Sequence, residues 1–237
     1  MLSVGAATVV IMIEPDFVTA TRAAYDTVAV SYAELLRDHL ATEPFDRAML
    51  DAFAALVGAE AGSVADAGPV VEAGCGPGRI TGYLHHLGLD VSGVDLSPAM
   101  IEVARAAHPD VRFTVGSMTA LDVPDGGLAG LVAWYSIIHT PPELLPGVFA
   151  EFRRVLRPGG RLLLAFQVGD ERVRIERAYG HAVDVDAYRL PPDHVAELLA
   201  AAGFAVEARL VRAARPPERT PQAYLIATAG VAREEVR

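Results

Sequence analysis

The residues best suited to chemistry lie in one short run, Glu72-Ala73-Gly74-Cys75-Gly76-Pro77-Gly78. An apolar stretch over residues 69–73 leads into this run and a helical pattern follows it, so we expect a buried strand, a glycine turn and a helix. Glycines let backbone N–H groups approach a ligand closely, and the N-terminus of the following helix carries partial positive charge. The arrangement suits a nucleotide-like ligand.

The spacing of the glycines and the acid before them narrow the class of ligand. A dinucleotide-binding turn requires G-x-G-x-x-G, but the position of its third glycine is occupied by Arg79, and Gly78 stands one residue earlier. Glu72 also fits poorly beside a pyrophosphate, whereas a carboxylate fits well near a cationic ligand that bears an ammonium group.

The run therefore resembles the first motif of the class I S-adenosylmethionine-dependent methyltransferase family, which reads E/D-x-G-x-G-x-G. The resemblance implies S-adenosyl-L-methionine as the cofactor. It also implies that Gly74, Gly76 and Gly78 line the methionine part of the cofactor together with Cys75, and that Glu72 acts nearby.

A second acid, Asp95, ends the next predicted strand, near residues 90–94, and lies 21 residues after Gly74. A carboxylate there can accept hydrogen bonds from both hydroxyls of a ribose, and the resembling family carries an acid in this role. The alternative is that Asp95 only caps the helix that begins at Ser97. The adjacent Leu96 is predicted to cover the adenine face.

The loop after the third predicted strand, residues 111–115, supplies Ser117 and Met118. In related methyltransferases this loop meets the edge of the adenine, often with an acid at the position of Ser117. Ser117 can still hydrogen-bond the exocyclic amine, and the backbone N–H of Met118 can reach a ring nitrogen. Both residues are therefore predicted as cofactor contacts.

The fourth predicted strand, residues 128–135, ends in Tyr135, with His139 four residues further on. Ligands of open α/β sheets lie at the carboxyl ends of strands, so Tyr135 is predicted to touch the cofactor and His139 to meet the methyl acceptor. A neutral imidazole there can remove a proton from the acceptor. A structural histidine that bonds backbone is the alternative, and the sequence leaves both open.

Residues 14–60 have a helical pattern and are predicted to form an N-terminal helical lid. Tyr25 and Tyr32 are seven residues apart and share one helix face. Since many small-molecule methyltransferases cover the cofactor with such a helix, Tyr25 is predicted to contact the cofactor and Tyr32 to face the acceptor. Core packing is the alternative for one of the two rings.

Strands and helices alternate from residue 69 onward, which is the signature of a parallel sheet. We predict an α/β fold, a doubly wound, seven-stranded, mostly parallel sheet with helices on both faces, forming a Rossmann-like core over residues 61–237. The turn Leu156-Arg157-Pro158-Gly159-Gly160 resembles a structural turn of the same family. The strands are expected at 69–73, 90–94, 111–115, 128–135, 161–167, 204–212 and 222–229.

Residues 168–190 interrupt this pattern with a polar, charged stretch, expected to be irregular and to form a roof over the acceptor. Tyr188 is predicted to face the acceptor. Several arginines of the stretch can bind a carboxylate or phosphate, although solvated surface is the alternative for most.

Composition restricts the partners. The net charge is −10 and no lysine is present, which argues against nucleic acid as the substrate. One cysteine excludes an internal disulfide or a multi-cysteine zinc site and is compatible with a reducing cytoplasm; no metal site is predicted. The apolar residues 1–13 are too short to span a bilayer and lack the basic start of a signal peptide, so we expect a disordered tail and no membrane partner.

We therefore predict a cytoplasmic transferase that moves a methyl group to an O or N atom of a small-molecule acceptor by in-line displacement, with S-adenosyl-L-homocysteine as the product. The alternatives are a methyltransferase acting on protein or nucleic acid, a nicotinamide oxidoreductase, and a cofactor-binding protein without catalysis. The sequence does not predict the acceptor or the oligomeric state.

Overall fold

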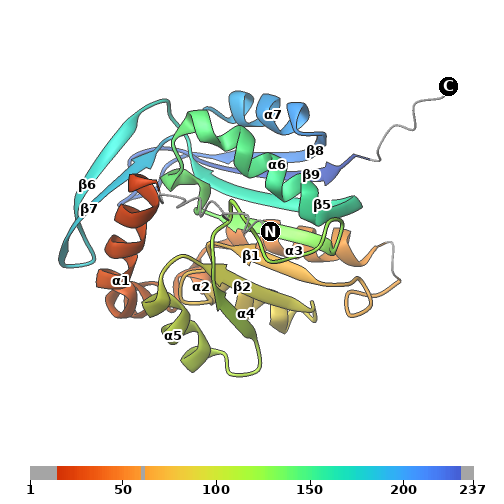
Figure 1. Cartoon of the computed structure of the whole chain (residues 1–237), viewed down its shortest axis with the longest axis horizontal. Helices are drawn as coiled ribbons and strands as arrows, with labels where there is room; N and C mark the ends of the chain where they lie inside the picture. Colours follow the sequence, from red (N-terminus) through yellow and green to blue (C-terminus); the bar gives the residue numbers. More distant parts are fainter. Residues whose placement is uncertain (1–14, 60–61, 231–237) are drawn as a thin grey trace, which may run out of the picture.

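A computed structural model of the chain describes residues 15–59 and 62–230 (Figure 1). Its main feature is a seven-stranded sheet with the order β3-β2-β1-β4-β5-β9-β8. The strands of this sheet are β1 (Val70–Ala73), β2 (Val91–Asp95), β3 (Arg112–Val115), β4 (Leu128–Trp134), β5 (Leu156–Gln167), β8 (Phe204–Arg212) and β9 (Gln222–Ala229).

Six of these strands run in one direction, and β9 runs antiparallel to its neighbours β5 and β8. The predicted class, a doubly wound and mostly parallel seven-stranded sheet, is confirmed. The fifth strand begins earlier than expected, because residues 156–160 already belong to β5. Every residue of β4 is buried, as expected for a strand covered on both faces by helices.

Helices cover the two faces of the sheet. On one face, α6 and α7 share a hydrophobic core with the sheet, and Figure 1 shows the two helices together above it. On the other face, α3 and α4 pack into a second core. The helices are α1 (Asp16–Leu36), α2 (His39–Thr42), α3 (Pro44–Gly58), α4 (Arg79–His86), α5 (Pro98–Ala107), α6 (Leu145–Val155) and α7 (Pro192–Ala201), with short 3₁₀ turns η1 (Ile137–His139) and η2 (Pro142–Leu144).

The N-terminal helices divide into two groups. Leu50 and Phe53 of α3 are fully buried in the core beneath the sheet, so α3 is not part of a lid. Helix α1 instead packs against α5 through Val28 and Met100. Asp26 fixes this contact by accepting a hydrogen bond from the Ser97 hydroxyl at 2.6 Å. The covering segment is therefore narrower than residues 14–60.

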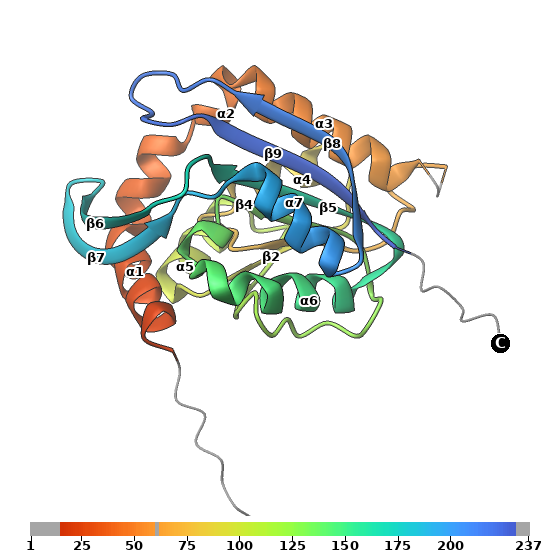
Figure 2. The ribbon, with the colours of Figure 1, turned by 90° about the horizontal axis from the view of Figure 1, so that it is seen from above.

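The expectation that residues 168–190 are irregular was wrong, whereas their place over the acceptor stays a prediction. The segment forms a regular antiparallel hairpin of β6 (Arg172–Ala178) and β7 (His181–Tyr188), which stands beside α1 in Figures 1 and 2. Charged side chains pair across it, as Arg172 does with Asp186 at 2.6 Å. Arg172 and Arg174 alternate with Val173 and Ile175, which is the period of a strand, so the expectation of irregular structure gave too much weight to the high charge of the segment.

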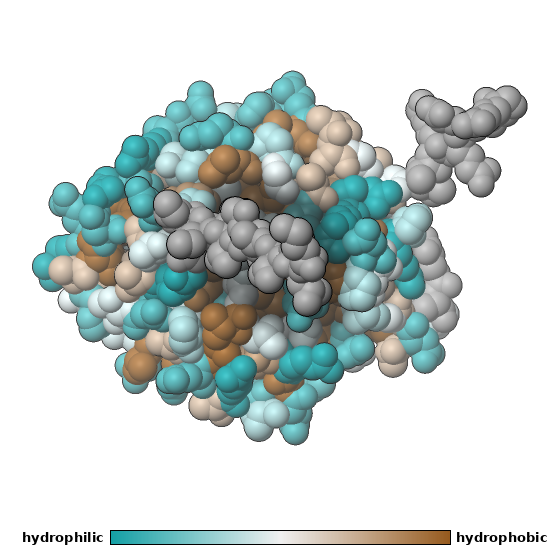
Figure 3. Space-filling model, in the orientation of Figure 1, coloured by the Kyte–Doolittle hydropathy of each residue, from teal (hydrophilic) through white to brown (hydrophobic). Residues whose placement is uncertain are grey.

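The expected tail over residues 1–13 lies outside the described residues. Within residues 15–59 and 62–230, no helix is long and apolar enough to cross a membrane. Figure 3 shows hydrophilic side chains around the rim of one face and apolar side chains nearer its centre.

Candidate functional site

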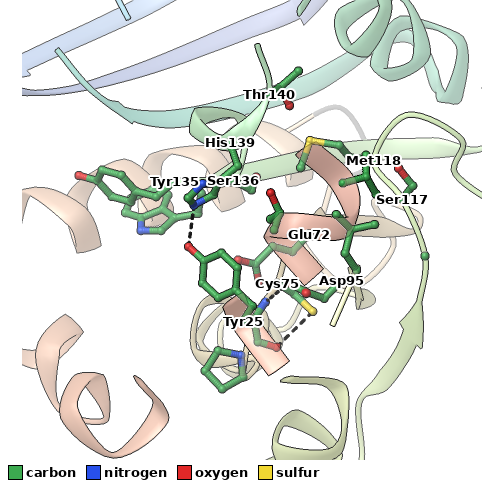
Figure 4. A pocket seen from close by; sticks show the side chains of 18 of the residues that line it. Tyr25, Glu72, Cys75, Asp95, Ser117, Met118, Tyr135, Ser136, His139 and Thr140 are labelled. Atoms are coloured by element: carbon green, nitrogen blue, oxygen red, sulfur yellow. Dashed lines mark hydrogen bonds between the residues drawn. The ribbon is translucent and has the colours of Figure 1, made fainter. Parts of the chain in front are cut away.

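A first pocket opens at the carboxyl ends of β1, β2 and β4, beneath α1 (Figure 4). All of the predicted site residues except Gly78 and Tyr188 line it. The predicted residues that the fold brings together here are Tyr25, Tyr32, Glu72, Gly74, Cys75, Gly76, Asp95, Leu96, Ser117, Met118, Tyr135 and His139.

The three glycines of the turn have different surroundings. A Cβ on Gly78 would lie 2.8 Å from the Phe113 ring, and a Cβ on Gly74 would lie 2.3 Å from the Cβ of Ser136. Protein packing therefore requires both of these glycines, and Gly78 starts α4 with φ +81° without lining the pocket. A Cβ on Gly76 would have no closer neighbour than the Met100 sulfur at 4.0 Å. Gly76 is the one of the three with open space beside it.

Asp95 joins the glycine turn to the start of α5. Its carboxylate accepts hydrogen bonds from the backbone N–H of Gly76 at 2.7 Å and of Ser97 at 2.9 Å. Burial raises the pKa of Asp95, while these backbone donors oppose that rise. The capping contact of the alternative interpretation is therefore present, and the same carboxylate also lines the first pocket.

Glu72 is a buried acid in the lining of the first pocket. It is 2% exposed and accepts a hydrogen bond from the Thr81 hydroxyl. Burial raises the pKa of Glu72 to about 8, an effect that Thr81 and the nearby Arg79 reduce. A cation placed beside this carboxyl would favour its ionised form.

Arg79 was not predicted as a site residue, although it directly follows the third glycine. It lines the pocket, and its Nη1 is buried without a hydrogen-bond partner in the described part of the chain. Trp134 Nε1 is likewise buried and without a partner, and Trp134 lines the same pocket. Residues of the first pocket therefore include two buried N–H donors without a partner as well as carboxylates.

His139 has both ring nitrogens in hydrogen bonds (Figure 4). Nδ1 lies 2.8 Å from the carbonyl oxygen of Asp186 in β7, and Nε2 lies 2.7 Å from the Tyr25 hydroxyl. A carbonyl only accepts, so Nδ1 carries the proton and Nε2 accepts the hydrogen of Tyr25. Burial lowers the pKa of His139 and raises that of Tyr25. The imidazole is therefore neutral, and the lone pair of its Nε2 is occupied by the Tyr25 hydroxyl.

Tyr135 ends β4 in an unusual conformation. Its φ is +53°, a region that residues other than glycine rarely adopt and that is often found at functional sites. Its hydroxyl lies 3.2 Å from that of Tyr224, which donates to Asp46 at 2.6 Å. A buried polar chain thus leads from the pocket wall into α3.

Ser117 and Met118 line the first pocket on the side away from Tyr25 (Figure 4). Ser117 is held by Thr119, whose backbone N–H donates to the Ser117 hydroxyl at 3.2 Å. A Cβ on Gly74 would lie 3.5 Å from the terminal methyl of Met118, so Met118 closes the space above the glycine turn.

A second pocket adjoins the first. The two share Tyr25, Tyr32, Arg79 and Tyr135 as lining residues. Tyr188, predicted to face the acceptor, lines neither pocket; it packs against the core beside α6 and α7 because of its position at the end of β7. No group of three or more metal-ligating side chains occurs within residues 15–59 and 62–230.

Comparison with known proteins gives a consistent result. Residues 70–160 match a family model described as a methyltransferase domain. An uncharacterized methyltransferase of Mycobacterium tuberculosis is 35% identical over 120 residues, which cover 49% of this chain and 47% of that protein. A demethylmenaquinone methyltransferase of Renibacterium salmoninarum is 30% identical over 156 residues, 64% of this chain and 59% of that protein. The chain spans about half the length of the curated relatives it matches.

A solved structure extends the likeness to nearly the whole chain. The 1,6-didemethyltoxoflavin-N1-methyltransferase of Burkholderia thailandensis superposes with a TM-score of 0.65 at 21% identity, covering 96% of this chain and 94% of that one. At this identity the likeness shows the fold alone, whereas the matched domain contains the glycine turn, Asp95 and all of β4. Residues 70–160 thus form a methyltransferase domain, and the chain resembles the class I methyltransferases that use S-adenosyl-L-methionine.

Proposed function

We propose that the chain binds S-adenosyl-L-methionine in the first pocket and transfers its methyl group to a small molecule in the second. The observation that carries this proposal is the shared wall: Tyr25, Tyr32, Arg79 and Tyr135 line both pockets. Two ligands in adjoining pockets can meet there, as a direct displacement between donor and acceptor requires.

The polar side chains of the first pocket fit the cofactor. The buried carboxyl of Glu72 suits the ammonium group of its methionine part, and the unpartnered Nη1 of Arg79 suits the carboxylate. Asp95 suits the ribose hydroxyls. When bound, this cofactor supplies a methyl group already activated by a sulfonium, so the chain's own residues mainly have to orient two reactants and exclude water.

Tyr25 and His139 provide a route for the proton of an acceptor hydroxyl. The neutral Nε2 of His139 accepts the hydrogen of Tyr25, and Tyr25 lines both pockets. In this arrangement Tyr25 takes the acceptor's proton while passing its own to His139. The Asp186 carbonyl keeps the imidazole in the required tautomer. His139 is then a base that acts through Tyr25.

Three observations support a small-molecule acceptor with a reacting O or N atom. The second pocket adjoins the first and has tyrosines in its lining, and the net charge of −10 opposes nucleic acid. The names of two similar proteins give demethylmenaquinone and 1,6-didemethyltoxoflavin as what they methylate. A protein or nucleic-acid acceptor would instead need an open approach to the shared wall.

Calorimetry tests the first half of this proposal. We expect micromolar binding of S-adenosyl-L-methionine and S-adenosyl-L-homocysteine and no measurable binding of NAD. Turnover of isotope-labelled methyl donor with a panel of hydroxylated and amino metabolites tests the second half. Preference for NAD would refute the cofactor assignment, whereas tight cofactor binding with methylation of proteins alone would refute the small-molecule acceptor.

A further inference from the structure

We propose that the methyl acceptor carries an anionic group, a carboxylate or a phosphate, and that Arg189 binds this group in the second pocket with help from Arg219. This inference rests on the proposed function, because it takes the ligand of the second pocket to be the acceptor. The anion would lie away from the wall shared with the first pocket, where the reacting atom must be.

The second pocket is assembled from segments far apart in the chain. Tyrosines come from α1 and from the turn of the β6–β7 hairpin: Tyr32 packs edge-on against Tyr25 with ring centroids 6.2 Å apart and against Tyr179 at 4.9 Å. The connection between β8 and β9 adds further lining residues. In Figure 2 this connection lies at the same end of the molecule as α1 and the hairpin. The aromatic walls favour a flat ligand.

Positive side chains outnumber negative ones around this pocket. Its lining includes four arginines, Arg79, Arg189, Arg212 and Arg219, but only two acids, Asp46 and Glu218. The charge of Glu218 is paired with Arg212, which donates a hydrogen bond of 2.6 Å to each of its two carboxylate oxygens. Asp46 accepts the hydroxyl hydrogen of Tyr224, and burial raises its pKa. The remaining arginines therefore lack a matching negative charge within the pocket lining.

Arg189 has the clearest unused donor. Its Nη1 pairs with Glu171, but its Nε is buried and has no hydrogen-bond partner in residues 15–59 and 62–230. The side chain is only 17% exposed. A guanidinium N–H removed from water without an acceptor is costly, and an anionic oxygen in the second pocket would remove that cost.

Arg219 adds a second positive charge at the rim of the pocket. It lies in the connection between β8 and β9, is exposed, and makes no ion pair within the described residues. An exposed arginine of this kind attracts an anion over a short range that salt screens. We therefore expect Arg219 to contribute less to binding than the buried donor of Arg189.

The test compares acids with neutral molecules of the same shape. The full chain is saturated with S-adenosyl-L-homocysteine and titrated by calorimetry with 4-hydroxybenzoate, 4-hydroxybenzamide and phenyl phosphate. We expect at least one acid to bind about tenfold or more tightly than the amide, the value of a charge-assisted hydrogen bond. The stronger of the two acids identifies the anion as a carboxylate or a phosphate.

Matched variants assign the effect to a residue. Arg189→Gln should reduce the preference for the acid to less than about threefold, and Arg219→Gln should reduce it by a smaller factor. Arg209→Gln is the control, because Arg209 pairs with Asp193 and lines neither pocket. Binding of S-adenosyl-L-homocysteine and the melting temperature show whether each variant is folded. Should Arg189→Gln fail to fold, Arg189→Lys is titrated instead, with the same expected loss of preference because a lysine has no Nε–H in that position.

Two results would overturn the inference. One is a wild-type chain that binds the amide as tightly as both acids, or binds neither acid at millimolar concentration. The other is a preference for the acid that is unchanged in Arg189→Gln. That result would mean a general attraction of anions to the surface. A chain that does not bind S-adenosyl-L-homocysteine at all refutes the proposed function itself, so the two failures are distinguishable.

Discussion

The first and second pockets share a wall but differ in how the chain builds them. The carboxyls of the first, Glu72 and Asp95, belong to neighbouring parallel strands, β1 and β2, whose pairing brings them to one edge of the sheet. The arginines of the second, Arg189 and Arg219, lie in two connections that meet only in the folded chain. One pocket follows from local sequence, and the other depends on long-range packing.

The pockets also differ in charge. Two acids and one arginine line the first, whereas four arginines and two acids line the second. Because a sulfonium is cationic, this division would place a positive donor and a negative acceptor on the two sides of one aromatic wall. Under this proposal each ligand would have a preferred pocket, since a ligand in the wrong one would leave buried charges unpaired.

The largest expected effect concerns the wall between the pockets. His139→Ala and Tyr25→Phe should each lower turnover by about 10²–10⁴-fold, the usual contribution of general base catalysis. If the two residues act in series, the double variant should be no slower than the worse single one. The measurement is the turnover number of each variant, divided by the fraction of folded protein, together with its melting temperature. Loss of stability with an unchanged rate would make His139 structural.

The pH profile sharpens the same point. Burial lowers the pKa of His139, so the neutral, proton-accepting form persists below the ordinary value of about 6.5. Turnover should therefore fall only on the acid side of that value and stay level at neutral pH. The acid limb should be absent in His139→Ala, and a limb retained by that variant would contradict the assignment.

A smaller effect is expected for the acid of the first pocket. Asp95→Ala should weaken binding of the cofactor by about 1.5–3 kcal/mol, as for lost hydrogen bonds to a charged group, or roughly 10- to 150-fold in Kd. Asp90→Ala, which removes an exposed acid just before β2, is the matched control and should bind normally. Calorimetry that finds the same Kd for a folded Asp95→Ala chain would remove Asp95 from the site.

Glu72 should couple cofactor binding to proton release. The pKa of its carboxyl is about 8, so near pH 7 it is mostly protonated, and a bound cation favours losing that proton. Affinity should then rise with pH up to about 8, with up to one proton released per cofactor. Calorimetry in two buffers of different ionisation enthalpy counts that proton. Release that is unchanged in Glu72→Gln would trace it to another group.

The smallest effect is expected for Tyr188→Phe. This residue lines neither pocket, so the Kd of the cofactor and the turnover number should both stay within about twofold of wild type. A tenfold change in turnover with unchanged stability would show that the acceptor extends beyond the second pocket toward the end of β7.

Local patterns in the sequence determined much of this molecule. The run from Glu72 to Gly78, the acid at Asp95 and the alternation of apolar strands with helices predicted the sheet and the first pocket's edge. These features can be predicted because each depends on residues that are adjacent in the chain. A turn needs its glycines, and a buried strand needs consecutive apolar side chains. The cap at Ser97 is of the same kind, and its hydroxyl does accept the Met100 N–H at 3.1 Å.

Tertiary structure alone decided the rest. The group that orients His139 is the backbone carbonyl of Asp186. Every residue has a backbone carbonyl, so the sequence cannot predict which one His139 contacts. The ion pair between Arg172 and Asp186 forms only because β6 and β7 fold back on each other as a hairpin. Arg189 and Arg219 meet at one pocket because of how distant connections pack. Burial, which determines the unused donor of Arg189 and the pKa of Glu72, is a property of the assembled fold.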